Sequence, residues 1–223
     1  MENKMRFIIA TTLVAISTGV LGTDDNCNQH FPEKCAPEGD IEFPETEKAY
    51  DETCPILVNL YKCMQEHAVE CGSDNLEDIT AYLELLEDVC RKDSRLYKAL
   101  ASNTGCIKKS IVEECSDDIY TVYKTYRHSM EREASSGEIS DEIRKKLFCM
   151  VQAYEVLCAS NAVAQCGETV KDAVLELAHR TDYMEKKKLC PRNVRGEAVK
   201  DIPVLQISVF KKLQLEELLL LEN

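Results

Sequence analysis

Two stretches of this chain repeat one cysteine spacing: Cys, eight residues, Cys, seven residues, Cys-Gly. The first reads CPILVNLYKCMQEHAVECG and begins at Cys54, and the second reads CMVQAYEVLCASNAVAQCG and begins at Cys149. Apart from the cysteines and the glycine, the two stretches share almost nothing. The cysteine spacing is thus kept while the residues between the cysteines vary. This indicates that the bonds formed by the cysteines constrain the chain.

The residues between these cysteines follow a helical period. Apolar residues after Cys54 recur every three or four positions as far as Ala68, and Gly72 is a typical helix stop. Glycine and proline are scarce, with 8 and 6 residues, and no Asn-Gly hairpin signal separates alternating apolar runs. The sequence therefore predicts an all-α fold.

Helix geometry restricts how the repeated cysteines can bond. On one continuous helix, Cys54 and Cys63 lie roughly 13 Å apart along the axis and about 180° apart around it. A disulfide requires Cα atoms within about 7 Å, so these two cysteines cannot bond each other, and neither can Cys149 and Cys158. Each must bind a cysteine on a different neighbouring element. We expect a disulfide-stapled helical bundle built from two related Cys-x8-Cys-x7-Cys helical units.

Antiparallel registers predict six disulfides. A hairpin that turns near Gly72 brings the first cysteine of the repeat opposite Cys90. A separate helix from Cys106 to Cys115, followed by a new helix capped at residues 116–118, would lie antiparallel to the end of the first helix. The N-terminal arm would then bind the second unit. The expected pairs are Cys54–Cys90, Cys63–Cys115, Cys71–Cys106, Cys149–Cys190, Cys35–Cys158 and Cys27–Cys166. Other connectivities stay open, because twelve cysteines permit on the order of ten thousand pairings.

The first residues predict a secretory signal peptide. Lys4 and Arg6 precede an apolar run at residues 7–22, and small residues end it, so we expect the mature chain to begin at Thr23. The alternative is a membrane anchor, but the run is shorter than the roughly 20 apolar residues of a spanning helix and is interrupted by threonine and serine. We expect no later segment that is long and apolar enough to span a membrane. The cysteines would then meet an oxidising compartment, which predicts disulfide bonds and a secreted, extracellular protein.

The breaks in the pattern predict how the chain is organised. The Ser-Ser-Gly loop at residues 135–137 is the best internal boundary. The expected segments are a signal peptide (1–22), a cysteine-containing N-terminal arm (23–53), a first helical unit (54–134), a second helical unit packed with the first as one domain (138–190), and a cysteine-free tail (191–223). The tail holds one amphipathic helix at best, from Phe210 to Leu221. It is interpreted either as an interaction helix or as a disordered or wrongly predicted segment, since no cysteine tethers it.

The cysteine framework resembles a known family. The stretch VCRKDSRLYKALASNTGCIKKSIVEEC (Val89 to Cys115) and the later cysteines are similar to the arthropod 27 kDa haemolymph glycoproteins and related secreted, cysteine-rich helical proteins. Those later cysteines are Cys149, Cys158, Cys166 and Cys190. The resemblance rests on spacing and helical pattern, and it implies an all-helical protein of haemolymph or a secretory gland, in a family whose molecular activity is not settled. The chain departs from a glycoprotein in having no Asn-x-Ser/Thr site.

No catalytic, metal or nucleotide motif accompanies the cysteines. The four histidines, His30, His67, His128 and His179, have no metal-ligand spacing, and no P-loop, dinucleotide fingerprint or Ser-nucleophile elbow occurs. A net charge of −13 argues against nucleic acid and anionic membrane surfaces as partners. We therefore expect a protein that is not an enzyme and has no cofactor or metal site.

Two classes of function fit these features. The first is a binding or carrier protein for a small apolar ligand, because a stapled helical bundle can keep an apolar cavity open. The alternative is an interaction protein that acts on an extracellular protein through its surface, as a venom, immune or structural component. A large exposed apolar patch would favour this alternative. A hydrolase is a third interpretation, which would need a histidine beside a serine or carboxylate in a cleft.

Overall fold

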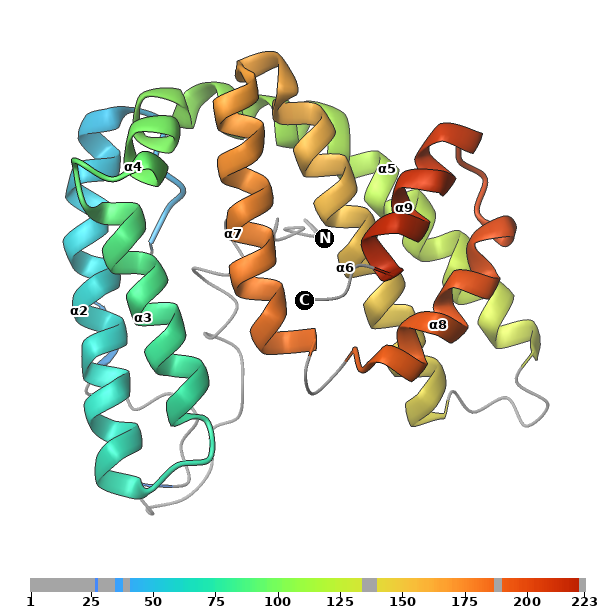
Figure 1. Cartoon of the computed structure of the whole chain (residues 1–223), viewed down its shortest axis with the longest axis horizontal. Coiled ribbons are helices and arrows are strands. Elements are labelled where there is room, and N and C mark those ends of the chain that lie inside the picture. The colour runs from blue at the N-terminus through green and yellow to red at the C-terminus, as the bar shows by residue number, and fades with distance from the viewer. Residues whose placement is uncertain (1–26, 28–34, 38–40, 134–139, 187–189, 221–223) are drawn as a thin grey trace. The chain divides into compact units, whose positions relative to one another are not determined.

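The computed structural model describes residues 27, 35–37, 41–133, 140–186 and 190–220, and every regular element within these ranges is helical. The prediction of an all-α fold stapled by disulfides is confirmed, whereas the predicted signal peptide lies outside the described residues (Figure 1). The α-helices are α2 (Glu47–Cys71), α3 (Leu76–Cys90), α4 (Arg95–Leu100), α5 (Thr104–Glu133), α6 (Asp141–Ala162), α7 (Glu168–Lys186), α8 (Arg192–Asp201) and α9 (Val209–Leu220). Short 3-10 helices are η2 (Ala101–Asn103), η3 (Val163–Cys166) and η4 (Ile202–Val204).

The chain divides into two compact units, residues 1–108 (unit 1) and 109–223 (unit 2). The division therefore falls within α5 and not between residues 134 and 138, where the sequence placed it. The expected break at residues 116–118 is also wrong, because α5 is one helix from Thr104 to Glu133. The reason is visible in its buried residues, which continue at steps of three and four through this point: Ile107, Ile111, Cys115, Ile119, Val122, Tyr126 and Met130.

In unit 1, α2 begins earlier than its first cysteine suggests. The side chain of Thr46 caps the helix by accepting a hydrogen bond from the backbone N–H of Ala49 at 3.1 Å, so that Pro55 lies inside the helix. Gly72 ends the helix in the left-handed conformation (φ 59°), as the sequence predicted. The chain then returns along α3, and the two helices lie side by side (Figure 1).

The core of unit 1 lies between α2 and α3. It contains Cys35 of the N-terminal arm together with apolar residues of both helices, so the arm takes part in the packing. The helical members are Leu57, Leu60, Tyr61, Met64, Ala68, Ile79, Leu83 and Leu86. These positions recur at three and four, which is the spacing that gave the helical prediction.

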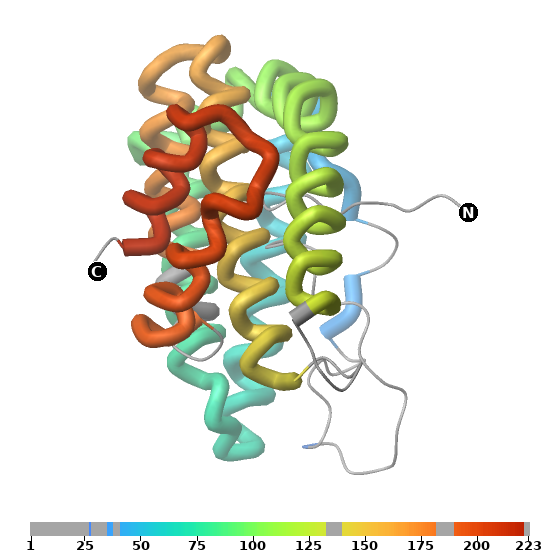
Figure 2. The backbone as a smooth tube through the Cα atoms, turned by 90° about the vertical axis from the view of Figure 1, so that its right-hand side faces the viewer, coloured from blue at the N-terminus to red at the C-terminus, as the bar shows by residue number. Residues whose placement is uncertain are grey.

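In unit 2, α6 is the central helix. α7 packs against α6 and η3, while α8 and α9 pack against α6 and against each other (Figure 2). The expected cysteine-free tail is helical and packed as far as Leu220, because it forms α8, η4 and α9, so the prediction of one amphipathic helix at best or a disordered segment is wrong. Leu215 and Leu219 of α9 are 0% and 2% exposed, so apolar packing holds this segment where no disulfide does.

Candidate functional site

Five disulfides are defined between individual cysteines: Cys27–Cys71, Cys35–Cys63, Cys54–Cys90, Cys115–Cys158 and Cys149–Cys190. Cys106 and Cys166 are disulfide-bonded as well, and no cysteine is free in the described part of the chain. The predicted pairs Cys54–Cys90 and Cys149–Cys190 are confirmed. The inference that cysteines of one repeat bond other elements and not each other is also confirmed.

The other four predicted pairs are wrong: Cys63–Cys115, Cys71–Cys106, Cys35–Cys158 and Cys27–Cys166. The N-terminal arm binds α2, through Cys27–Cys71 and Cys35–Cys63, and not the second unit. Cys115 of α5 binds α6 instead of α2. The arm cysteines are eight residues apart, and so are the last two cysteines of each repeat, so a register test alone accepts either helix as the arm's partner.

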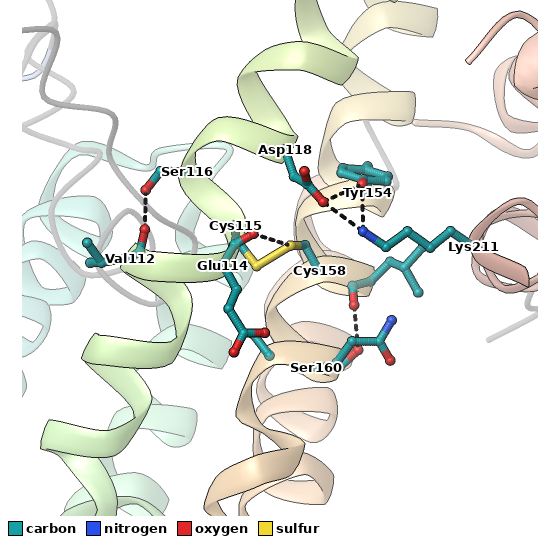
Figure 3. Close-up of a disulfide and its surroundings, with 12 residues drawn as sticks. Val112, Glu114, Cys115, Ser116, Asp118, Tyr154, Cys158, Ser160 and Lys211 are labelled. Carbon is teal, nitrogen blue, oxygen red and sulfur yellow. Dashed lines mark hydrogen bonds and ion pairs between the residues drawn. A yellow bond between two sulfur atoms is a disulfide. The ribbon is translucent and has the colours of Figure 1, made fainter. Parts of the chain in front are cut away.

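The disulfide between Cys115 of α5 and Cys158 of α6 fixes two polar side chains close to each other. Asp118 lies one turn after Cys115, and Tyr154 lies one turn before Cys158, so both side chains project near the disulfide (Figure 3). The Tyr154 hydroxyl lies 3.4 Å from Oδ2 of Asp118. The Nζ atom of Lys211, in the first turn of α9, donates to Asp118 Oδ2 at 2.7 Å and lies 3.4 Å from the Tyr154 hydroxyl.

Two groups of this cluster, the phenol of Tyr154 and the ammonium group of Lys211, have raised pKa values. Burial is the main cause for Tyr154, whose pKa lies above the ordinary value for tyrosine. For Lys211, burial is the largest single influence and lowers the pKa, but the hydrogen bonds and charges of Asp118 and Tyr154 together outweigh it and raise the pKa. Lys211 is therefore held as a cation, and the cluster joins α5, α6 and α9 through its ion pair with Asp118.

A pocket of about 230 Å³ opens beside this cluster in unit 2. It is smaller than the roughly 300–1,000 Å³ of pockets that enclose drug-sized ligands. Its walls mix methyl groups with hydroxyls and the ion pair, and the lining residues are Asp118, Thr121, Val122, Thr125, Tyr154, Gln206, Ile207, Ser208 and Lys211. The sequence did not single out this site, because its residues come from three segments with no shared motif.

The outward face of α9 is defined here as Val209, Phe210, Leu213 and Leu220. Among the helices of the described residues, it presents the most exposed apolar side chains. Val209 is 74% exposed, Phe210 67% and Leu213 61%. The opposite side of the same helix carries the buried Leu215 and Leu219. α9 is thus apolar on two faces, of which the fold covers one.

Unit 1 holds a separate polar cluster around Asp51 of α2. Its Oδ1 accepts a hydrogen bond from the Tyr97 hydroxyl of α4 at 2.6 Å, and its Oδ2 pairs with Lys92 Nζ at 2.7 Å. The bonds from Lys92 first and Tyr97 second lower the pKa of Asp51. The hydrogen bond to Asp51 is in turn the main reason that the pKa of Tyr97 rises to about 12. This cluster ties α2 to α4 and is structural in character.

Metal-ligating residues do not gather anywhere in the described part of the chain: no group of three or more His, Cys, Asp or Glu side chains is placed to hold an ion there. His67 is buried beside Cys71, with ring nitrogens 3.8 and 3.9 Å from its sulfur, and thus packs against a disulfide.

One helical stretch among the described residues, Asp141–Cys166, has the length and composition that crossing a membrane requires. The expectation that no segment after the leader would reach this length and hydrophobicity is wrong. Within the fold, 61% of the apolar window is buried, and two of its cysteines, Cys149 and Cys158, are bonded to neighbouring segments. Packing in the core of unit 2 accounts for its apolar composition.

Comparisons with known proteins found no matching family model, no similar curated protein and no similar solved structure. The resemblance to the haemolymph glycoproteins therefore rests on the cysteine spacing and helical pattern of this sequence and stays a prediction.

Proposed function

We propose that the protein is a secreted, non-enzymatic protein that acts by binding a protein partner through the outward face of α9. The observation that carries this proposal is the exposure of Val209, Phe210 and Leu213, each more than three-fifths accessible on a well-packed helix. Contiguous exposed apolar side chains mark interaction surfaces more often than chance, because leaving them in water costs free energy.

Secretion is supported by the disulfides and by the predicted leader. Twelve cysteines that are all bonded are typical of proteins that fold in an oxidising compartment. The resemblance to secreted haemolymph proteins agrees with this proposal. The acidic net charge of −13 suits a protein that stays dissolved in an extracellular fluid.

The carrier hypothesis receives less support from the pocket beside Lys211. An apolar ligand is held by apolar walls that exclude water, and here an ion pair and several hydroxyls line the cavity. Its volume of about 230 Å³ is also small for a long-chain ligand. We therefore place surface recognition ahead of transport of a small apolar molecule.

A photo-crosslinking experiment tests the proposal. Benzoylphenylalanine is placed at position 213 or, as a matched control, at Val69 of α2, which is 62% exposed. Both proteins are irradiated in the native fluid, and the adducts are identified by mass spectrometry. We expect one dominant protein adduct at position 213 that is absent at position 69. Identical adducts at both positions would contradict the proposal, and saturable binding of a fluorescent fatty acid would favour the carrier.

A further inference from the structure

The charges of α9 run against the dipole of the helix. Lys211 and Lys212 lie in its first turn and Glu216 and Glu217 near its end, with no acidic residue in the first turn and no basic residue in the last. A helix favours anions at its N-terminus and cations at its C-terminus, so both pairs are placed unfavourably for the helix itself. Interactions with groups outside the helix can offset this cost.

The two lysines are accounted for within unit 2. Lys211 pairs with Asp118 at 2.7 Å, as described above, and this bond anchors the start of α9 to α5. Lys212 donates from Nζ to the backbone oxygen of Pro203 at 3.0 Å, which ties α9 to the preceding η4. Both lysines therefore stabilise the packing of α9 against its own unit.

The two glutamates are not accounted for in this way. Glu216 and Glu217 are exposed, and no hydrogen bond or ion pair joins either of them to another residue in the described ranges. At about 100° per residue, they flank the line from Leu213 to Leu220 on its two sides. The outward face of α9 thus presents apolar side chains between two carboxylates that have no partner.

We propose that the occupant of this face is a cationic amphipathic segment of a partner protein. Its apolar side chains would cover Leu213 and its neighbours, while its Lys or Arg side chains would pair with Glu216 and Glu217. This inference rests on the proposed function and names the chemistry of the partner. A second copy of the chain fits less well, because the lysines of α9 are already bonded and each copy carries a net charge of −13.

Three synthetic peptides with one amphipathic leucine pattern test this chemistry. Their polar positions are all Lys, all Gln or all Glu, and binding to the full protein is measured by fluorescence anisotropy. We expect the Lys peptide to bind about tenfold more tightly than the Gln peptide, as two rim ion pairs allow, and the Glu peptide to bind least. The advantage of the Lys peptide should shrink in 0.5 M salt, where the screening length is only a few Å.

Charge reversal separates this pairing from apolar contact. The double variant Glu216→Lys/Glu217→Lys should reverse the order of the three peptides without loss of helix content, because lysine suits the end of a helix. The matched control is Glu66→Lys, an exposed carboxylate one turn before the exposed Val69 of α2, and it should leave the order unchanged. Leu213→Ser should weaken the binding of all three peptides.

The outcomes distinguish this inference from the proposed function. Equal binding of the Lys and Gln peptides, or a crosslinked segment without basic residues, would overturn the cationic partner and leave surface recognition standing. Loss of the crosslink at position 213 would overturn both. A concentration-dependent dimer in sedimentation that Leu213→Ser abolishes would assign the face to a second copy and overturn the inference.

Discussion

α2 and α6 carry the same cysteine spacing, yet the protein holds these two helices in different ways. α2 has 25 residues, of which seven are buried, whereas the shorter α6 has 22 residues, of which ten are buried. α2 has α3 on one side and is bonded to the N-terminal arm by two disulfides. α6 is packed against α7, α8 and α9 and is bonded to α5.

This difference shows what a cysteine repeat determines and what it leaves open. The spacing sets where a helix is stapled, but the amount of apolar surface that it buries depends on how many neighbours the rest of the chain supplies. Unit 1 packs one long hairpin and the short helix α4 around a small core, which offsets less of the conformational entropy of folding, so unit 1 depends more on its bonds. Unit 2 has several helices around one core and depends more on packing.

The strongest test of this difference is complete reduction of the disulfides. Each disulfide stabilises a fold by about 2–4 kcal/mol. Unit 1 should therefore unfold when its disulfides Cys27–Cys71, Cys35–Cys63 and Cys54–Cys90 are reduced. We expect hydrogen exchange followed by mass spectrometry to show loss of protection in α2 and α3, while α6 and α9 keep slow amides. Simultaneous loss in both units, or earlier loss in unit 2, would refute the comparison.

The next largest effect is expected from the core of unit 2. Leu215→Ala removes a side chain that is 0% exposed and should lower the free energy of unfolding by about 2–5 kcal/mol, measured by urea denaturation. The control Leu213→Ala, on the exposed face of the same helix, should change it by less than about 0.5 kcal/mol. Equal effects would mean that α9 does not contribute to the core.

A smaller effect is expected from the ion pair that anchors α9. A double-mutant cycle with Asp118→Asn and Lys211→Met should give a coupling of about 0.2–1 kcal/mol, because both side chains are at least one-third exposed and solvent screens them. Thermal unfolding of the four proteins supplies the measurement. A coupling of zero would mean that the ion pair adds no stability and that apolar contacts alone hold α9 in place.

The smallest effect concerns the Asp51 cluster of unit 1. Because the pKa of Asp51 is lowered in the folded state, its contribution to stability is present above the ordinary value near 3.8 and is lost as the pH falls through the lower folded value. We therefore expect Asp51→Asn to lower the melting temperature at pH 6 and to have less effect near pH 3. A difference that is the same at both pH values would contradict this assignment.

The sequence predicted the fold class and two of the disulfides for one physical reason. Cys54–Cys90 and Cys149–Cys190 each close a turn between neighbouring helices in the chain, so local register decides them. The other defined pairs span comparable lengths of chain, 28 to 44 residues, but the eight-residue spacing of Cys27 and Cys35 matches the last two cysteines of either repeat. Because of the internal repeat, the cysteine spacing could not decide whether the N-terminal arm is bonded to α2 or to the second repeat.

Two further errors came from local signals that packing overrides. Ser116 looks like a helix cap, but its hydroxyl donates to the backbone oxygen of Val112 one turn earlier, inside a helix that continues. The uninterrupted apolar spacing on either side of it was the better signal. In α9, the run of leucines belongs to two different faces of the helix. Leu215 and Leu219 face the core, whereas Leu213 and Leu220 are exposed.

The three bonds of unit 1 overlap along the chain, since Cys27–Cys71 encloses Cys35–Cys63 and both overlap Cys54–Cys90. A protease that cuts once anywhere between residues 27 and 90 therefore cannot release a fragment, because at least one bond always spans the cut. The nicked protein would migrate as one species until it is reduced. For the secreted protein that we propose, this arrangement means that a single cleavage in the hairpin leaves the chain covalently connected.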